Sequence, residues 1–243
     1  PPVAVDRVRH VGEPVAVIIA ETLLQAKDAA ELIELDIDDL PVVASIDRAF
    51  APGAPEIWSE TPGNVAFHWQ IGDAAATTAA FSKAAHVAKL DLVNSRVICN
   101  AMEPRTATGE FDEGKQEYTL WLSSQNPHVQ RVLLATATLK APESKIRVIS
   151  PDVGGGFGSK AFHYNEDVIV LWAAKRVGRP VHWAADRSEA FVSDRHGRDH
   201  LTHVELALDK DAKFLALRVS TKANMGAYYS TFGPAIPTYY YAP

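Results

Sequence analysis

A run of glycines in the middle of the chain offers the clearest opportunity for binding chemistry. Gly154, Gly155 and Gly156 are followed by Phe157 and Gly158. An apolar stretch typical of a strand precedes the run, and a stretch typical of a helix follows it. Glycines let a backbone turn sharply and approach a ligand closely, and free N–H groups before a helix attract anions. The residues therefore predict a cradle of backbone N–H groups, with a purely structural turn as the alternative.

Spacing excludes the two common nucleotide-binding loops. A P-loop needs a glycine directly before its lysine, whereas Ser159 precedes Lys160 here. The dinucleotide pattern G-x-G-x-x-G would need a glycine in the place of the same serine. Residue types alone thus leave the ligand of the cradle open.

Other chemically active residues have an ordinary structural explanation beside a functional one. His163 and Glu166 lie three residues apart on a predicted helix, which suits a metal site or simply an acidic first helical turn. Glu103 and Arg105 can pair with each other, line a pocket or anchor a turn. The residues do not separate these alternatives.

Cysteine content and charge limit the classes of protein. The single cysteine, Cys99, supplies neither a disulfide nor the ligands of an iron–sulfur cluster, and its apolar neighbours predict a buried, inert thiol. The formal net charge of -6 argues against a nucleic-acid-binding protein. No apolar stretch approaches the roughly 18 residues of a membrane span, and no signal peptide is visible, so we expect a cytoplasmic protein. A charged block made of residues 186–189 and 195–199 predicts a solvated face.

The elements around the loop follow from periodicity and turn residues. A helix is predicted to begin after Thr22, with Gln25 completing a capping box, between short strands at 15–20 and 35–37. Asp73 is expected to cap another helix. The remaining predicted elements are strands at 86–100, 106–112, 117–124, 145–150, 180–185, 202–208 and 214–221, and helices at 74–81, 127–139 and 161–177.

Strands and helices mix without strict alternation, which indicates an α+β fold. Residues 51–64 have the proline- and glycine-rich composition of a linker, so we predict one domain over 1–55 and another over 56–243. The chain opens on Pro-Pro without an initiator methionine, and we expect an internal piece of a longer protein.

Four stretches, in order, resemble the molybdenum-binding large subunits of the xanthine dehydrogenase, aldehyde oxidase and aerobic carbon monoxide dehydrogenase family. They are Met102–Arg105, Ser124–His128, Pro151–Lys160 and Lys222–Tyr228. Residues 1–50 resemble the tail of that family's hammerhead domain. The resemblance implies the C-terminal part of a hammerhead-type α/β domain, followed by the first molybdenum-cofactor-binding domain with mixed sheets and helices.

The resemblance also implies roles for individual residues. Gln125 would donate its side-chain amide to an oxo ligand of molybdenum. Gly155, Gly156, Phe157 and Gly158 would wrap the face of the metal, and the phenylalanine would help to wall the substrate pocket. The chain would supply no metal ligand, because the pterin holds the molybdenum.

The family reaction is hydroxylation of an electrophilic carbon with oxygen from water. A glutamate that lies further downstream in the family acts as the base, and electrons leave through 2Fe–2S clusters to FAD. The resemblance further implies a molybdopterin cofactor in its cytosine dinucleotide form. It also implies an FAD-binding medium subunit and an iron–sulfur small subunit as partners, with the charged block of residues 186–189 and 195–199 near the cofactor or a subunit interface.

One departure from the family narrows the expected substrate. Its purine hydroxylases carry a glutamate directly after the loop lysine, where this chain has Ala161. The difference favours an aldehyde, a simpler heteroarene or carbon monoxide over xanthine. We expect the chain alone to be inactive, and the alternative is a non-catalytic binding or assembly module that retains the fold.

Overall fold

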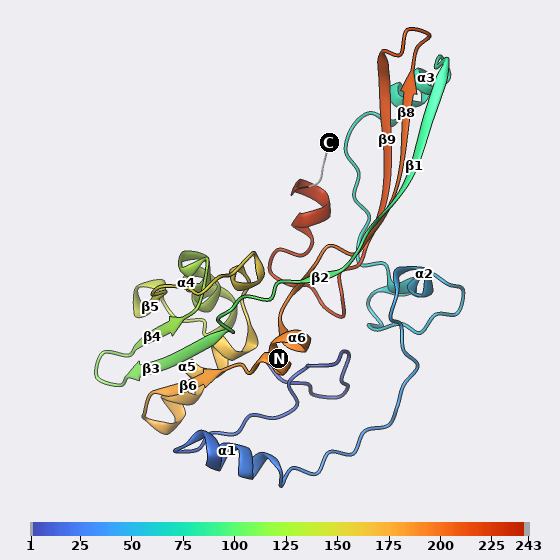
Figure 1. Ribbon diagram of the computed structural model, residues 1–243. Coiled ribbons are helices and arrows are strands. Elements are labelled where there is room, and N and C mark those ends of the chain that lie inside the picture. The colour runs from blue at the N-terminus through green and yellow to red at the C-terminus, as the bar shows by residue number, and fades with distance from the viewer. Residues whose placement is uncertain (1, 241–243) are drawn as a thin grey trace. The chain divides into compact units, whose positions relative to one another are not determined.

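The computed structural model describes residues 2–240 and contains the mixture of helices and sheets expected of an α+β protein (Figure 1). The outer ends of the two predicted domains, residue 1 and residues 241–243, lie outside the described part. Contacts divide the chain into two compact units. Each unit consists of two segments of the chain. The first unit contains the residues up to Asp39 together with Ile98–Arg195, and the second contains Leu40–Val97 together with the residues from His196 onward. The domain division at residue 55 stays a prediction.

A four-stranded sheet with the order β5-β4-β3-β6 forms the centre of the first unit. β3 pairs antiparallel with β4 and β6, whereas β4 and β5 are parallel. β3 and β4 form a hairpin, and the two strands predicted at 106–112 and 117–124 are confirmed. The strands are β3 (Thr106–Asp112), β4 (Glu117–Leu122), β5 (Ile146–Ile149) and β6 (Val181–Ala184), and the helices are α1 (Leu23–Ala30), α4 (Pro127–Leu133), α5 (Asn165–Val177) and α6 (Arg187–Ser193).

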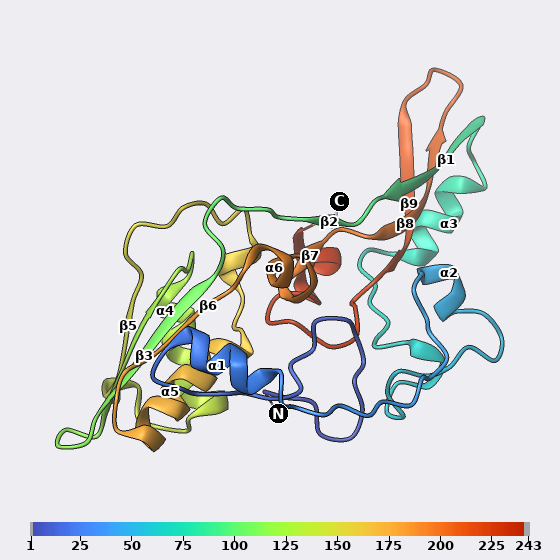
Figure 2. The ribbon, with the colours of Figure 1, turned by 60° about the horizontal axis from the view of Figure 1, so that its bottom comes forward.

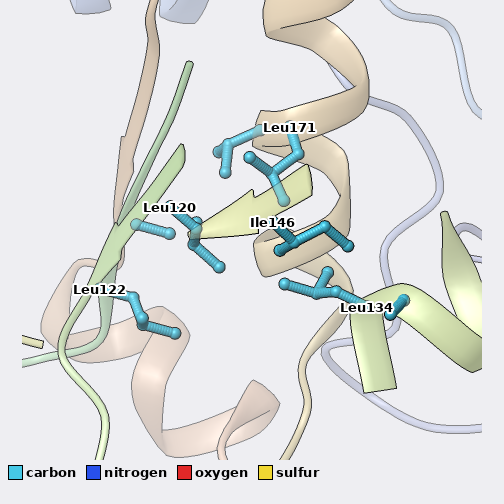
Figure 3. Close-up of a cluster of buried hydrophobic side chains, with 8 residues drawn as sticks. Leu120, Leu122, Leu134, Ile146 and Leu171 are labelled. Atoms are coloured by element: carbon cyan, nitrogen blue, oxygen red, sulfur yellow. The ribbon is translucent and has the colours of Figure 1, made fainter. Parts of the chain in front are cut away.

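One face of this sheet carries the core of the unit. α5 packs along β3 and β6, and α4 packs against β5 (Figure 2). Side chains alternate between the faces of a sheet, so the apolar residues of neighbouring strands gather on one side. Figure 3 shows buried side chains of the sheet and the helices meeting there, namely Leu120, Leu122, Leu134, Ile146 and Leu171. Burial of each such side chain contributes about 1.5–3 kcal/mol, which holds both helices on the sheet.

The helices next to the glycine loop differ in detail from their predicted bounds. α4 begins at Pro127 as predicted and continues as a π-helical turn, Leu134–Thr138. α5 begins at Asn165 rather than at 161, because a separate 3-10 turn occupies Ser159–Ala161. The predicted end is confirmed, since Gly178 adopts the left-handed conformation that closes many helices.

Two strands predicted near the N-terminus are wrong. The structure assigns no strand to residues 15–20 or 35–37. A strand needs a neighbour to pair with its N–H and C=O groups, and within residues 2–240 neither segment joins a sheet. The helix between them has the predicted capping box: the Thr22 hydroxyl accepts from the Gln25 N–H at 3.2 Å, and the Gln25 side chain accepts from the Thr22 N–H at 3.1 Å.

The second unit contains a long antiparallel sheet with the order β1-β8-β9 (Figure 1). β8 and β9 form a hairpin, the strands predicted at 202–208 and 214–221 are confirmed, and Asp73 caps α3 as expected. The single strand predicted at 86–100 is interrupted, and its last part pairs with β7 instead. The elements are α2 (Ile46–Ala49), α3 (Ala74–Phe81), β1 (His86–Asn94), β2 (Val97–Ile98), β7 (His196–Gly197), β8 (His200–Leu208) and β9 (Phe214–Ala223). Within residues 2–240, no helix combines the length and the apolar character needed to cross a membrane.

A buried ionic cluster ties the helices of the first unit to the segment before β3. Arg105 is 4% exposed and pairs with Glu166 at 3.0 Å and with Asp194 at 2.5 Å. Its guanidinium lies 3.7 Å from the centre of the Tyr164 ring. Burial alone would lower the pKa of Arg105, but the carboxylates, Glu166 above all, raise it, so the cation is retained.

The prediction of a solvated face over residues 186–189 and 195–199 is wrong for two of its arginines. Arg195 is half-buried, and its guanidinium lies 5.2 Å from the centre of the Tyr164 ring. Arg187 donates to the carbonyl oxygens of Ala101 and Met102 at 2.7 and 3.0 Å. These charges serve as partners for buried groups and carbonyls, which composition alone cannot distinguish from solvated charges.

Asp167, at the start of α5, is a second buried acid. Its carboxylate accepts a hydrogen bond from the Tyr164 N–H at 3.2 Å. Burial raises the pKa of Asp167 to about 7, although that hydrogen bond and the charge of Arg105 act to lower it. The folded protein therefore favours the protonated acid up to neutral pH.

We predict that Asp167→Asn stabilises the protein in a pH-dependent way. Between the ordinary pKa and the raised one, the unfolded chain loses the proton while the folded protein keeps it, so wild-type stability falls as pH rises. At about pH 4 the variant and the wild type should have similar free energies of unfolding. At about pH 8 the free energy of unfolding of the variant should be higher by about 2–4 kcal/mol. Urea unfolding at both pH values measures the difference, and a pH-independent difference would contradict the prediction.

Close contact between β3 and α5 yields a second prediction. A Cβ atom at Gly109 would lie 2.5 Å from the backbone carbon of Val170, so Gly109→Ala should destabilise the unit by about 3 kcal/mol. Gly114 in the neighbouring turn is a matched control, because its Cβ would meet only the Asp112 side chain, at 3.4 Å. Gly114→Ala should change the free energy of unfolding by at most about 0.5 kcal/mol. Equal effects in urea unfolding would show that the close approach is unimportant.

Candidate functional site

The glycine loop links β5 to the 3-10 turn before α5, and its backbone is sharply folded. Gly155 and Gly158 have φ angles of 94° and 95°, in the left-handed region that favours glycine. Phe157 also has a positive φ, 50°, and its side chain is 75% exposed. A non-glycine residue in this conformation costs about 1–2 kcal/mol, so contacts around the loop must hold it in place.

Gln125 packs against the loop and is hydrogen-bonded to both Lys160 and Gly158. Its backbone N–H donates to the Lys160 carbonyl at 3.0 Å, and its side-chain Oε1 accepts from the Gly158 N–H at 3.0 Å. Gly156 lies so close that a Cβ there would be 2.3 Å from this Oε1. Since the oxygen of the side-chain amide is engaged by the loop, its Nε2 group is the part that remains available to donate.

Several donors of the loop have no internal partner. Within residues 2–240, the backbone N–H groups of Gly155, Gly156 and Phe157 donate no hydrogen bond, and neither does Gln125 Nε2. The structure thus brings Gln125 together with Gly156 and Gly158, and among the described residues it leaves three donors on the loop and a fourth on the adjoining Gln125 side chain without a partner. Such an arrangement suits a ligand rich in oxygen atoms or negative charge.

Glu103 and Arg105 do not pair with each other. Glu103 Oε2 accepts from Lys160 Nζ at 2.8 Å, while Arg105 belongs to the buried ionic cluster. Burial acts to raise the pKa of Glu103, but hydrogen bonds from Lys160, Ser123 and Gly154 lower it below the ordinary value. Glu103 is therefore an ionised acceptor at neutral pH, and it was not assigned to the site from sequence.

Cys99 contacts the loop and corrects a prediction. The residue is half-buried rather than buried, and its Sγ donates to the Phe157 carbonyl at 3.0 Å. Its apolar sequence neighbours predicted a core position, but the segment after β2 runs beside the loop instead. The thiol therefore supports the loop residue with the least favourable backbone conformation.

His163 and Glu166 have separate partners. His163 Nδ1 lies 2.6 Å from Gln130 Oε1, and burial lowers the pKa of His163 to about 4, which keeps the ring neutral at physiological pH. Glu166 pairs with Arg105. Among residues 2–240, no group of three or more His, Cys, Asp or Glu side chains is arranged to hold a metal ion.

Several known proteins have sequences similar to this one. Residues 57–242 match the molybdopterin cofactor-binding domain family. The carbon monoxide dehydrogenase large chain of Afipia carboxidovorans is 36% identical over 242 residues, covering 95% of this chain and 30% of that protein. The nicotine 6-hydroxylase large subunit of Paenarthrobacter nicotinovorans is 33% identical over 231 residues, covering 94% of this chain and 28% of that protein. The chain thus spans less than a third of the length of these relatives.

Solved structures share the fold. A Cu,Mo carbon monoxide dehydrogenase in its carbon-monoxide-reduced state matches with a TM-score of 0.80 and 36% identity, covering 86% of this chain and 28% of that chain. Quinoline 2-oxidoreductase from Pseudomonas putida 86 matches with a TM-score of 0.80 and 32% identity, covering 95% of this chain and 29% of that chain. The α+β fold with mixed sheets is confirmed. Because the family match takes in the glycine loop and Gln125, this chain belongs to the molybdopterin cofactor-binding domain family, together with the xanthine dehydrogenases, aldehyde oxidoreductases and carbon monoxide dehydrogenases that it resembles.

Proposed function

We propose that this chain is part of the large subunit of a molybdenum hydroxylase and holds one side of the molybdopterin cofactor. The observation that carries the proposal is the hydrogen bond from the Gly158 N–H to Gln125 Oε1, because it engages the oxygen of the side-chain amide and leaves the Nε2 donor for a ligand. The unpartnered N–H groups of the same loop fit a cofactor rich in oxygen atoms. When bound, the cofactor supplies the metal at which water becomes the oxygen source for substrate hydroxylation.

The residues of the chain would position the cofactor and the substrate and would not react themselves. Gln125 Nε2 would donate to an oxygen of the cofactor, and the N–H groups of Gly155 and Gly156 would donate beside it. The exposed ring of Phe157 would form part of the wall of the substrate pocket. Donors that are fixed before the ligand arrives need no reorganisation during the reaction, which is the main source of their electrostatic effect. A glutamate base, as the resemblance implies, would come from outside these residues.

The partners and the form of the cofactor are also proposals. The one cysteine of the chain cannot ligate a 2Fe–2S cluster, which needs four ligands, so these residues do not hold such a cluster by themselves. We propose an iron–sulfur small subunit, an FAD-binding medium subunit and the cytosine dinucleotide form of the cofactor, in a cytoplasmic complex. Relatives named as large chains or large subunits support a complex. We also propose a hammerhead-type domain over 1–55 and a cofactor-binding domain over 56–243; the family match, which begins at residue 57, supports the second of these.

Ala161 restricts the proposed substrate. It follows the loop lysine and lies in the 3-10 turn Ser159–Ala161, so a methyl group stands where a purine-binding carboxylate would be required. We therefore propose an aldehyde, a simple heteroarene or carbon monoxide as the substrate. Carbon monoxide, nicotine and quinoline appear in the names of similar proteins, which supports this range.

A non-catalytic binding or assembly module is the alternative function. It would retain the fold without the cofactor. Elemental analysis of the natural protein that contains this chain separates the two, since an enzyme carries molybdenum and a binding module does not.

We predict that Gln125→Glu in the full-length subunit lowers turnover by about 100- to 1,000-fold, as does the loss of one preorganised donor in other active sites. The glutamate can still accept from the Gly158 N–H but has no N–H to donate. Gln116→Glu, the same change in the exposed turn between β3 and β4, is the matched control and should leave turnover unchanged. Steady-state kinetics measure turnover, with molybdenum content determined in parallel. Equal turnover in both variants would remove Gln125 from the site.

We also predict that the 243-residue chain by itself binds little or no molybdenum and shows no turnover. The reason is that the loop and Gln125 are proposed to form only one side of the cofactor cradle. Elemental analysis of the purified chain measures this. Stoichiometric molybdenum would show that the cradle is complete within these residues.

A further inference from the structure

A single carboxylate oxygen joins both ends of the glycine loop. Glu103 Oε2 accepts from the Gly154 N–H at 2.7 Å and from Lys160 Nζ at 2.8 Å. The Ser123 hydroxyl donates to the same oxygen at 2.8 Å. The Glu103 backbone N–H also donates to the Gly154 carbonyl at 3.2 Å. The first glycine of the loop is therefore held through both its N–H and its carbonyl.

Lys160 extends this connection to Gln125. The lysine side chain is 1% exposed, and its ammonium group depends on Glu103 for its charge partner. The Lys160 carbonyl accepts from the backbone N–H of Gln125 at 3.0 Å. Glu103 thus connects through one residue to the side chain proposed to contact the cofactor.

The packing leaves the loop no room to shift toward these partners. A Cβ at Gly154 would lie 2.5 Å from Glu103 Cβ, just as one at Gly156 would collide with Gln125. Movement of either side chain toward the loop must therefore move the loop backbone. Conversely, a fixed Glu103 fixes Gly154 while Gln125 fixes Gly158, and the unpartnered N–H groups lie between these two points.

We propose that Glu103 is a positioning residue for the cofactor-binding donors: without contacting the cofactor, its carboxylate sets the orientation of the loop and of Gln125. The inference rests on the proposed function. Partners one step removed from a metal centre commonly account for about 10- to 100-fold of activity or affinity. Three hydrogen bonds meet at one oxygen of Glu103, and one of them comes from a buried cation, so this carboxylate is held firmly at the loop.

The test is Glu103→Gln in the full-length subunit with its natural partners. The neutral amide keeps the length of the side chain but withdraws the charge partner of Lys160. We expect hydrogen–deuterium exchange in residues 152–160 to rise several-fold while exchange in α5 stays unchanged, and the molybdenum(V) EPR signal to shift. We further expect kcat to fall about 10- to 100-fold with little change in KM.

Two further variants define the outcome. Glu117→Gln removes the same charge from an ion pair with Lys145 at 3.2 Å on the same sheet, and should leave loop exchange and the EPR signal as in the wild type. Ser123→Ala removes one donor without leaving a buried charge unpaired, so it should loosen the loop to a smaller extent even if Glu103→Gln does not fold. Loop exchange and an EPR signal unchanged in both the Glu103 and Ser123 variants would overturn the positioning role. Absence of molybdenum from the wild-type subunit would instead overturn the proposed function and the inference that rests on it.

Discussion

A positive charge enclosed in the first unit is the constraint on which the glycine loop depends. The Lys160 side chain has almost no contact with solvent, and an ammonium group removed from water is costly unless a carboxylate and hydrogen bonds replace that solvent. Glu103, 57 residues earlier in the chain, supplies the carboxylate. Satisfying one buried cation therefore brings two distant segments together, and the loop between β5 and α5 is closed as a consequence.

The segment before β3 is held by charges on more than one side. Glu103 faces the loop, and Arg105, two residues later, faces Glu166 and Asp194 of the neighbouring helices. Arg187 binds the carbonyl groups just upstream. Networks of this kind lose much of their stability when one member is removed, because the remaining charges stay buried. The loop is thus supported by an ionic framework that the apolar core of the sheet holds in place.

Signals within a few residues predicted helix ends correctly, whereas contacts between segments far apart in the chain could not be predicted from the sequence. The capping box at Thr22 and the stop at Gly178 depend on neighbours within a few residues, and both were correctly expected. The strands at 15–20 and 35–37 failed because an apolar run cannot show whether a partner strand exists. The ion pair of Glu103 with Lys160 has no signature in the sequence, since any of the 30 acidic residues could have paired with a buried lysine. Gln125 and the loop were singled out together only through resemblance, and their contact required the structure.

The glycines of the loop divide into two kinds, and the division bears on the ligand. Gly155 and Gly158 are required by their backbone conformation, whereas Gly154 and Gly156 are required by the closeness of Glu103 and Gln125. Backbone conformation and internal packing thus explain all four without any ligand, so a glycine-rich sequence is by itself poor support for a binding site. What they leave unexplained is the set of loop N–H groups that have no internal partner, together with a Gln125 amide whose oxygen is already engaged. Those donors, rather than the glycines, are the features of the loop that call for a cofactor.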